Sequence, residues 1–93
     1  MNIDNAKKLV LEAIMATLEY EAEVTDNMQL IGGESLFDSM KLVELCLALE
    51  DIADENGFEF DWTSDAAMSR SRSMFRTVAS LTEEFSTQSE AQL

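Results

Sequence analysis

The sequence predicts a single all-α domain, a small bundle of three main helices plus one short helix, with a long loop between helices 1 and 2. Apolar residues recur every third or fourth position over residues 3–20 and 39–54, the spacing of a helix with one buried face. The one stretch with strand-like alternation, residues 58–62, has no second stretch to pair with. Ninety-three residues suit one domain with a modest core and are too few for two.

The first helix is expected to run from Ile3 to about Tyr20, capped by Asn2. A segment without helical period follows from Glu21 to Phe37. It contains turn formers, but it is too apolar for a free linker, so it is expected to lie across the core. The predicted buried face of the first helix consists of Ile3, Ala6, Val10, Ala13, Ile14 and Leu18, and the apolar loop residues are Met28, Leu30, Ile31, Leu36 and Phe37.

A second helix is expected from Ser39 to about Asp54, capped by Asp38 and ending near Asn56-Gly57. Placing its residues at about 100° per step gives two stripes. One is a core face, whereas the other is an apolar strip edged with carboxylates, which a core does not require. The core stripe is Leu42, Leu45, Cys46, Leu49, Ile52 and Ala53, and the other stripe is Met40, Val43, Glu44, Leu47 and Asp51, with Glu50 at its border.

The remaining third of the chain is predicted to be a connector, a short helix and a last helix. Phe58, Phe60 and Trp62 are expected to press an extended connector into the core, and Thr63 or Ser64 then caps the short helix. The Ser-Arg alternation over residues 69–73 is interpreted as a polar connector. The last helix is expected to begin at a Thr77 cap and to bury Val78, Leu81 and Phe85, and the polar tail after Ser86, from about residue 87, is expected to fray.

The charge of the chain is strongly acidic and local. There are 19 acidic and 6 basic residues, a net charge of −13, and thirteen of the acidic residues lie between Glu19 and Asp61, where Lys41 is the one basic residue. This balance argues against binding to nucleic acid or to an anionic membrane and favours a basic protein partner or a cation. The absence of histidine removes the usual catalytic dyads and general base, so the chain is not expected to be an enzyme.

Several other motifs favour plain structural roles. The single cysteine, Cys46, falls on the core stripe and is expected to be a small buried hydrophobe. No signal peptide or membrane span is apparent, so a cytoplasmic protein is expected. An EF-hand fails, because setting Gly57 at loop position 6 puts Ile52 and Thr63 where carboxylates are required. The Gly32-Gly33 pair is interpreted as a turn rather than a phosphate-binding loop.

Ser39 is the strongest candidate for a functional residue. It lies in the first turn of the predicted second helix, where its hydroxyl would be exposed, and the apolar strip edged with Glu44, Glu50 and Asp51 follows it. This arrangement is typical of a docking surface centred on a modifiable hydroxyl. Because the chain contains no histidine base, an external enzyme would have to activate the serine.

The stretch from Asp38 to Asp51 resembles the Asp-Ser-Leu segment and recognition helix of acyl carrier proteins, and Arg76-Thr77-Val78 resembles the opening of their last helix. The resemblance implies that Ser39, flanked by Asp38 and Met40, carries 4′-phosphopantetheine, transferred from coenzyme A by a phosphopantetheinyl transferase. Acyl groups would then be carried as thioesters on the arm of a monomeric protein. Enzymes with basic patches would dock on the face made by Met40, Val43, Glu44, Leu47, Glu50 and Asp51.

Departures from the family pattern favour a specialised lipid, polyketide or surface-polysaccharide pathway. Lys41 stands where an acidic or neutral residue is common, so it is expected to influence partner choice, and Met40 replaces the usual leucine. Residues 58–62 and 69–73 are also unlike the usual segment. Three alternatives remain open, namely an aminoacyl or peptidyl carrier, in which Gly-Gly-Glu-Ser-Leu would make Ser35 the attachment site, an unmodified acidic helical adaptor, and a divalent-cation buffer.

Overall fold

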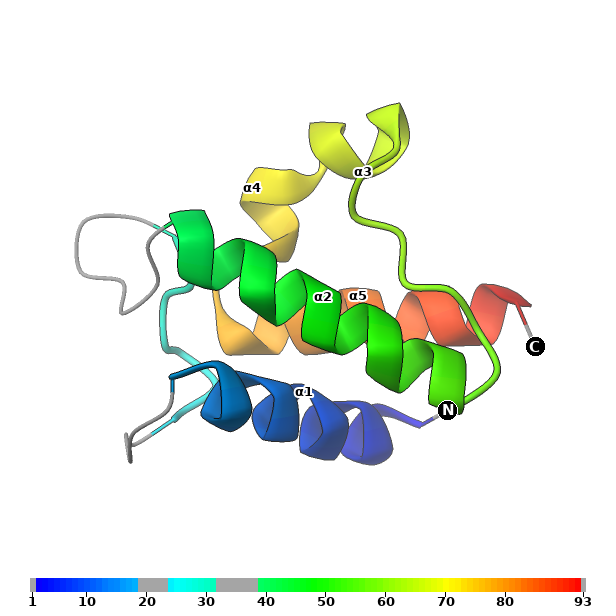
Figure 1. Cartoon of the computed structure of the whole chain (residues 1–93), viewed down its shortest axis with the longest axis horizontal. Helices are drawn as coiled ribbons and strands as arrows, with labels where there is room; N and C mark the ends of the chain where they lie inside the picture. Colours follow the sequence, from blue (N-terminus) through cyan, green and yellow to red (C-terminus); the bar gives the residue numbers. More distant parts are fainter. Residues whose placement is uncertain (1, 19–23, 32–38, 93) are drawn as a thin grey trace.

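The computed structural model describes residues 2–18, 24–31 and 39–92, with the side chains of residues 39, 71 and 72 outside the description. Five helices follow one another in these ranges (Figure 1). The described ranges contain no β-strand, since the bridge between Gln29 and Thr77 is isolated, and the predicted all-α class is confirmed. The helices are α1 (Ile3–Leu18), α2 (Ser39–Glu55), α3 (Asp65–Ser69), α4 (Ser71–Met74) and α5 (Val78–Gln92).

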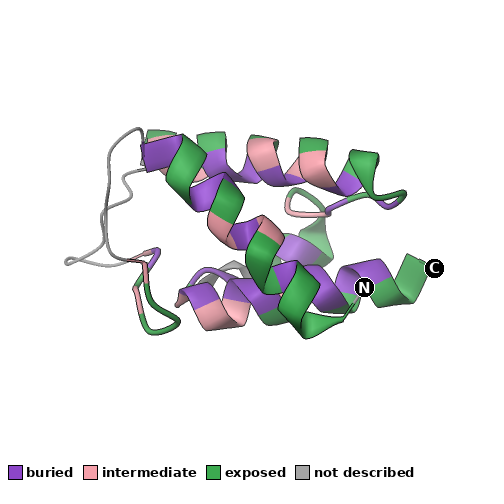
Figure 2. Ribbon diagram, turned by 90° about the horizontal axis from the view of Figure 1, so that it is seen from below, coloured by how far each residue is buried: buried purple, intermediate pink, exposed green. Residues whose placement is uncertain are grey.

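The three long helices enclose one core. Helix α1 packs against both α2 and α5, while α3 and α4 lie together beyond the upper side of α2 in the view of Figure 1. Figure 2 shows the buried residues turned toward the interior of the bundle and the exposed residues on its outer faces. The side chains with no exposed surface include Val10, Ile14, Leu30, Leu45, Leu49, Val78, Leu81 and Phe85.

The start of α1 and the end of α2 follow local sequence signals. Asn2 caps α1, since its side-chain oxygen accepts a hydrogen bond from Asn5 N at 2.9 Å. Helix α2 ends in a Schellman motif, in which Gly57 N bonds Asp54 O at 3.2 Å and Phe58 N bonds Ala53 O at 3.0 Å. Gly57 adopts the left-handed conformation that this motif requires, with φ of 86°.

The described part of the loop between α1 and α2 lies across the core, as expected, and also caps α5. Leu30 is fully buried, and Met28 is packed against the core. Val78 N donates to Met28 O and Ala79 N to Asp26 O, both at 3.0 Å, so loop carbonyls satisfy N–H groups of the first turn of α5. Leu36, Phe37 and the Gly32-Gly33 pair lie outside the described residues.

The polar connector predicted over residues 69–73 is wrong, because the chain forms α4 there after a single intervening residue, Arg70. The structure therefore has two short helices where the sequence predicted one. The guanidinium of Arg70 pairs with Glu84 of α5 at 3.1 Å. Met74 ends α4 and is buried, as is Phe75 after it. The ion pair of Arg70 and the burial of Met74 and Phe75 hold this segment at both ends, although its Ser-Arg composition suggests a loop.

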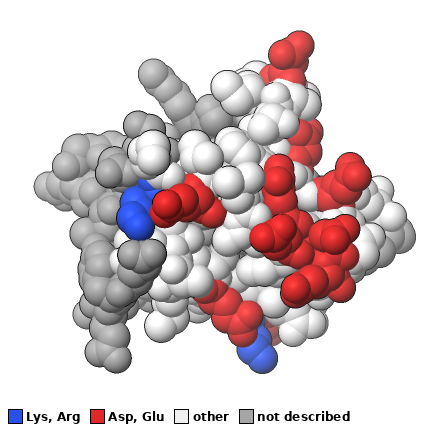
Figure 3. Space-filling view, in the orientation of Figure 1, with Lys and Arg blue, Asp and Glu red and all other residues white. Residues whose placement is uncertain are grey.

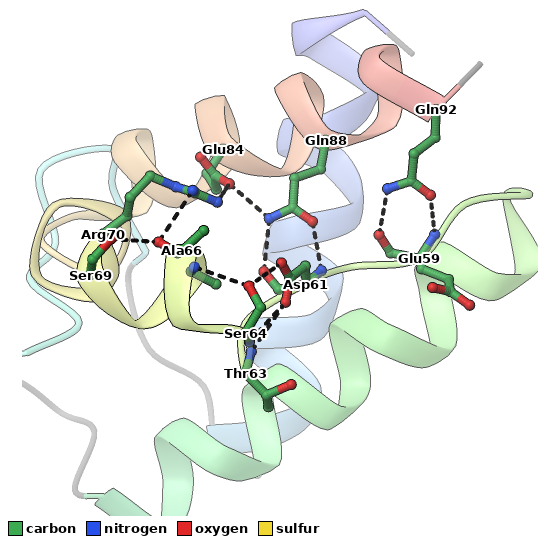
Figure 4. Close-up of polar contacts among 11 residues, drawn as sticks. Glu59, Asp61, Thr63, Ser64, Ala66, Ser69, Arg70, Glu84, Gln88 and Gln92 are labelled. Carbon is green, nitrogen blue, oxygen red and sulfur yellow. Dashed lines mark hydrogen bonds and ion pairs between the residues drawn. The ribbon is translucent and has the colours of Figure 1, made fainter.

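The predicted fraying after Ser86 is also wrong, because α5 continues to Gln92 and buries Gln88 and Ser89. The amide groups of Gln88 and Gln92 bind the connector that follows α2 (Figure 4). Gln88 accepts from Asp61 N at 2.6 Å and donates to Asp61 O at 2.8 Å. Gln92 makes the same pair of bonds with Glu59 N and O, at 2.9 and 2.8 Å.

The two glutamines can bond the connector because the spacing of residues along a helix matches the spacing along an extended chain. Residues four apart on a helix are separated by about 6.0 Å along its axis, and residues two apart in an extended chain by about 6.6 Å. Two glutamines of α5 therefore stand opposite two successive outward-facing peptide groups of the connector, as a neighbouring strand would. The outward-facing peptide groups of the connector are thus hydrogen-bonded without a sheet, while Phe58 and Phe60 face the core. Both rings pack against Phe85, with ring centroids 5.0 and 5.4 Å away.

Candidate functional site

The candidate site begins at the N-terminus of α2 and follows its outer face. Ser39 is the first residue of this helix. The predicted second stripe is confirmed as a surface, since Met40 is 74% exposed, Val43 44% and Leu47 48%, with Glu44 and Asp51 exposed beside them. Core and surface residues of α2 therefore lie on opposite faces of one helix, and the outer face is apolar with an acidic edge.

Lys41 is directed back toward the bundle. Its ammonium donates to Thr17 O in the last turn of α1 at 3.2 Å and pairs with Glu44 at 3.2 Å. A cation at this position is favourable because the last carbonyls of a helix carry partial negative charge. The expected influence of Lys41 on partners would therefore act from the edge of the outer face, through a side chain that also joins α1 to α2.

Glu50, at the border of the two stripes, is joined to the connector. The indole N–H of Trp62 donates to Glu50 Oε1 at 2.6 Å. Both residues are partly buried, and Trp62 packs against the core. A carboxylate of the predicted docking face thus also fixes an aromatic side chain of the connector.

An apolar cavity of about 210 Å³ lies beside the first turns of α2. Val43 and Met68 are exposed, at 44% and 60%, and so mark its opening to solvent. No charged side chain is among its described lining residues, which makes it suited to an apolar group. Its walls are Ile31, Leu42, Val43, Cys46, Trp62, Met68 and Phe75.

A second hollow, about 570 Å³, is acidic and lies between the C-terminal half of α2 and the connector. Glu50, Asp54, Glu59 and Asp61 contribute to its lining, and Figure 3 shows carboxylates gathered on this side of the molecule. The pKa of Asp61 is lowered, first by the hydrogen bond from the Ser64 hydroxyl and then by the Ser64 N–H. This local pairing keeps the carboxylate charged.

Cys46 has the buried structural position that its place on the core stripe predicts. It is 1% exposed, and burial, together with the charge of Glu50, raises the pKa of its thiol to about 12. A thiol that is protonated at neutral pH is a poor nucleophile and a poor metal ligand. Cys46 therefore serves as part of the cavity wall.

The structure leaves part of the predicted site untested and adds residues that the sequence did not reveal. Asp38 and Ser35 lie outside the described residues. Within the described part of the chain, no group of three or more acidic or cysteine side chains could hold a metal ion, and no helix is long and apolar enough to cross a membrane. The sequence did not predict that Met68 and Phe75 belong to the cavity wall. Met68 lies in α3 and Phe75 directly follows α4, and the residue pattern of these short segments is ambiguous.

No protein-family model matches the chain, and neither a curated protein nor a solved structure is significantly similar to it. The geometry of α2 and its surroundings is therefore what bears on function.

Proposed function

We propose that the protein is an acyl carrier protein, in which Ser39 carries a 4′-phosphopantetheine arm and α2 presents the arm to partner enzymes. The observation that carries the proposal is the sequence of features along one helix. A serine opens α2, an exposed apolar stripe with an acidic edge follows it, and an apolar cavity lies beside the first turns.

The N-terminus of α2 is chemically suited to the attachment. The first N–H groups of a helix have no partner within the helix, and together with the helix dipole they favour a negative charge. A phosphodiester on Ser39 would lie at this end. When bound, phosphopantetheine supplies the thiol that the chain itself lacks in accessible form, since Cys46 is buried.

The outer face of α2 has the properties of a transient docking surface. Met40, Val43 and Leu47 offer exposed apolar contacts, while Glu44 and Asp51 offer charges that attract a basic patch. Exposed charges increase the rate of encounter, and salt weakens their attraction. Weak and fast binding of this kind suits a carrier that visits several enzymes in turn.

The decisive experiment is intact-mass spectrometry after incubation with coenzyme A and a broad-specificity phosphopantetheinyl transferase. One phosphopantetheine should be added to the wild-type protein and to Ser35→Ala, and none to Ser39→Ala. Circular dichroism of each variant checks that the fold is retained.

Two other results would overturn the assignment. Addition that persists in Ser39→Ala and is lost in Ser35→Ala would place the arm as in peptidyl carriers. No addition to any variant would favour an unmodified acidic adaptor. Mass measurement of the protein from its native cell would further identify the acyl group carried.

A further inference from the structure

Trp62 occupies a position between the apolar cavity and the predicted docking face. Its ring forms part of the cavity wall together with Leu42 and Phe75, and its indole N–H is bonded to Glu50 Oε1 at 2.6 Å. Trp62 is the one tryptophan of the chain. Ile31 comes from the loop between α1 and α2 and Trp62 from the extended connector, whereas the other wall residues lie in helices or directly after one.

The connector backbone around Trp62 is held on both sides. Asp61 N and O are both bonded to the side chain of Gln88, and the N–H groups of Thr63 and Ser64 donate to Asp61 Oδ1 at 3.3 and 3.1 Å. These bonds restrict movement of the backbone. The orientation of the indole therefore depends on its side-chain torsions and on the hydrogen bond to Glu50.

We propose that Trp62, held in place by Glu50, is the residue that limits the length of the acyl chain the cavity accepts. The identity of the occupant rests on the proposed function, whereas the size limit rests on the cavity itself. Glu50 acts as a positioning residue, since it contacts the indole N–H and does not line this cavity.

The volume points to a short chain. A methylene group takes up about the space of a water molecule, roughly 30 Å³, so a cavity of about 210 Å³ that opens to solvent encloses at most about seven such groups. This is less than the roughly 300–1,000 Å³ of pockets for drug-sized ligands. The expected cargo is thus a short, unbranched acyl chain, and a longer chain fits within the cavity only if the Trp62 ring is removed or displaced.

The test is calorimetric titration of the protein without its arm with 1-hexanol and with 1-decanol. Wild type should bind 1-hexanol, and Trp62→Ala should raise the affinity for 1-decanol relative to 1-hexanol at least tenfold. Trp62→Phe retains a smaller ring and should fall between the two. Glu50→Ala should shift the ratio in the same direction and move the emission of Trp62 to longer wavelength, whereas Glu50→Gln, which retains an acceptor oxygen, should rescue both.

Glu55→Ala is the matched control, because it removes an exposed carboxylate of the same helix that does not line the cavity. It should leave the affinity ratio and the emission unchanged. The proposal is overturned if wild type does not bind 1-hexanol, if the ratio stays constant in Trp62→Ala and Trp62→Phe, or if Glu50→Ala behaves like wild type. These titrations do not depend on Ser39, so their outcome can be interpreted even if phosphopantetheine transfer fails.

Discussion

Replacing Gln88 by alanine tests how strongly α5 holds the connector. The substitution removes the two bonds to the backbone of Asp61 and a third bond, from Gln88 Nε2 to Glu84 Oε2 at 2.7 Å. The aromatic residues of the connector would then lose the attachment that aligns them with Phe85.

The size of the effect follows from the number of bonds and their exposure. A hydrogen bond contributes a net ~0.5–1.5 kcal/mol, so three contribute about 1.5–4.5 kcal/mol. Asp61 is only partly buried, so water can replace some of what is lost, and alanine favours the helix by a few tenths of a kcal/mol. We expect Gln88→Ala to lower the free energy of unfolding by about 2 kcal/mol, or the Tm by about 8–16 °C.

Urea denaturation followed by circular dichroism measures this loss directly, with Thr87→Ala as the control, because Thr87 is an exposed neighbour on the same helix. The control should unfold like wild type within about 0.5 kcal/mol. At neutral pH, Gln88→Glu should be less stable than Gln88→Ala, because its carboxylate would face both Asp61 O and the Glu84 carboxylate. A Gln88→Ala protein as stable as the control would refute the idea that paired glutamine amides replace a neighbouring strand.

Three further predictions concern the core and a helix end, each measured by urea denaturation. Ser89→Ala should raise stability by about 1 kcal/mol, since the Ser89 hydroxyl is buried without a hydrogen-bond partner, and a loss would contradict this. Gly57→Ala should lower it by about 1–2 kcal/mol through backbone strain alone, as no atom lies within 4 Å of the added Cβ; Gly57→Asn should lose less. Burial raises the pKa of Cys46 from 9.0 to about 12, so the buried thiol contributes stability that is present below pH 9 and lost above it. The free energy of unfolding should fall by about 1.4 kcal/mol per pH unit above pH 9, and the Cys46→Ala protein should lack this pH-dependent loss.

The helices were predictable where local signals and period agree. The cap of α1, the two stripes of α2 and the Gly57 ending depend on residues within a few positions of one another, so the sequence shows them directly. Thr77 is a similar case, since its hydroxyl accepts from Ser80 N at 3.2 Å at the start of α5. The outer stripe of α2 was found by the same reasoning, because exposure on one helix is also a local property.

The errors arose where distant groups decide the structure. Residues 87–92 look like a polar tail, but Gln88 and Gln92 are ordered by peptide groups 27 and 33 residues away. Arg70 is likewise anchored by Glu84, 14 residues later. Two glutamines four residues apart and an alternating aromatic stretch could have indicated this pairing. A single sequence contains many such spacings, however, and only the packing of the whole chain decides which of them form a contact.

The separation of the two faces of α2 has a consequence for sequence change. Leu45, Cys46 and Leu49 can be retained for folding while the outer residues vary without disturbing the core. Two positions lack this freedom, because Val43 belongs to both the outer stripe and the cavity, and Glu50 holds Trp62. A substitution at either position therefore changes more than the outer surface, because it also alters the cavity wall or the support of Trp62.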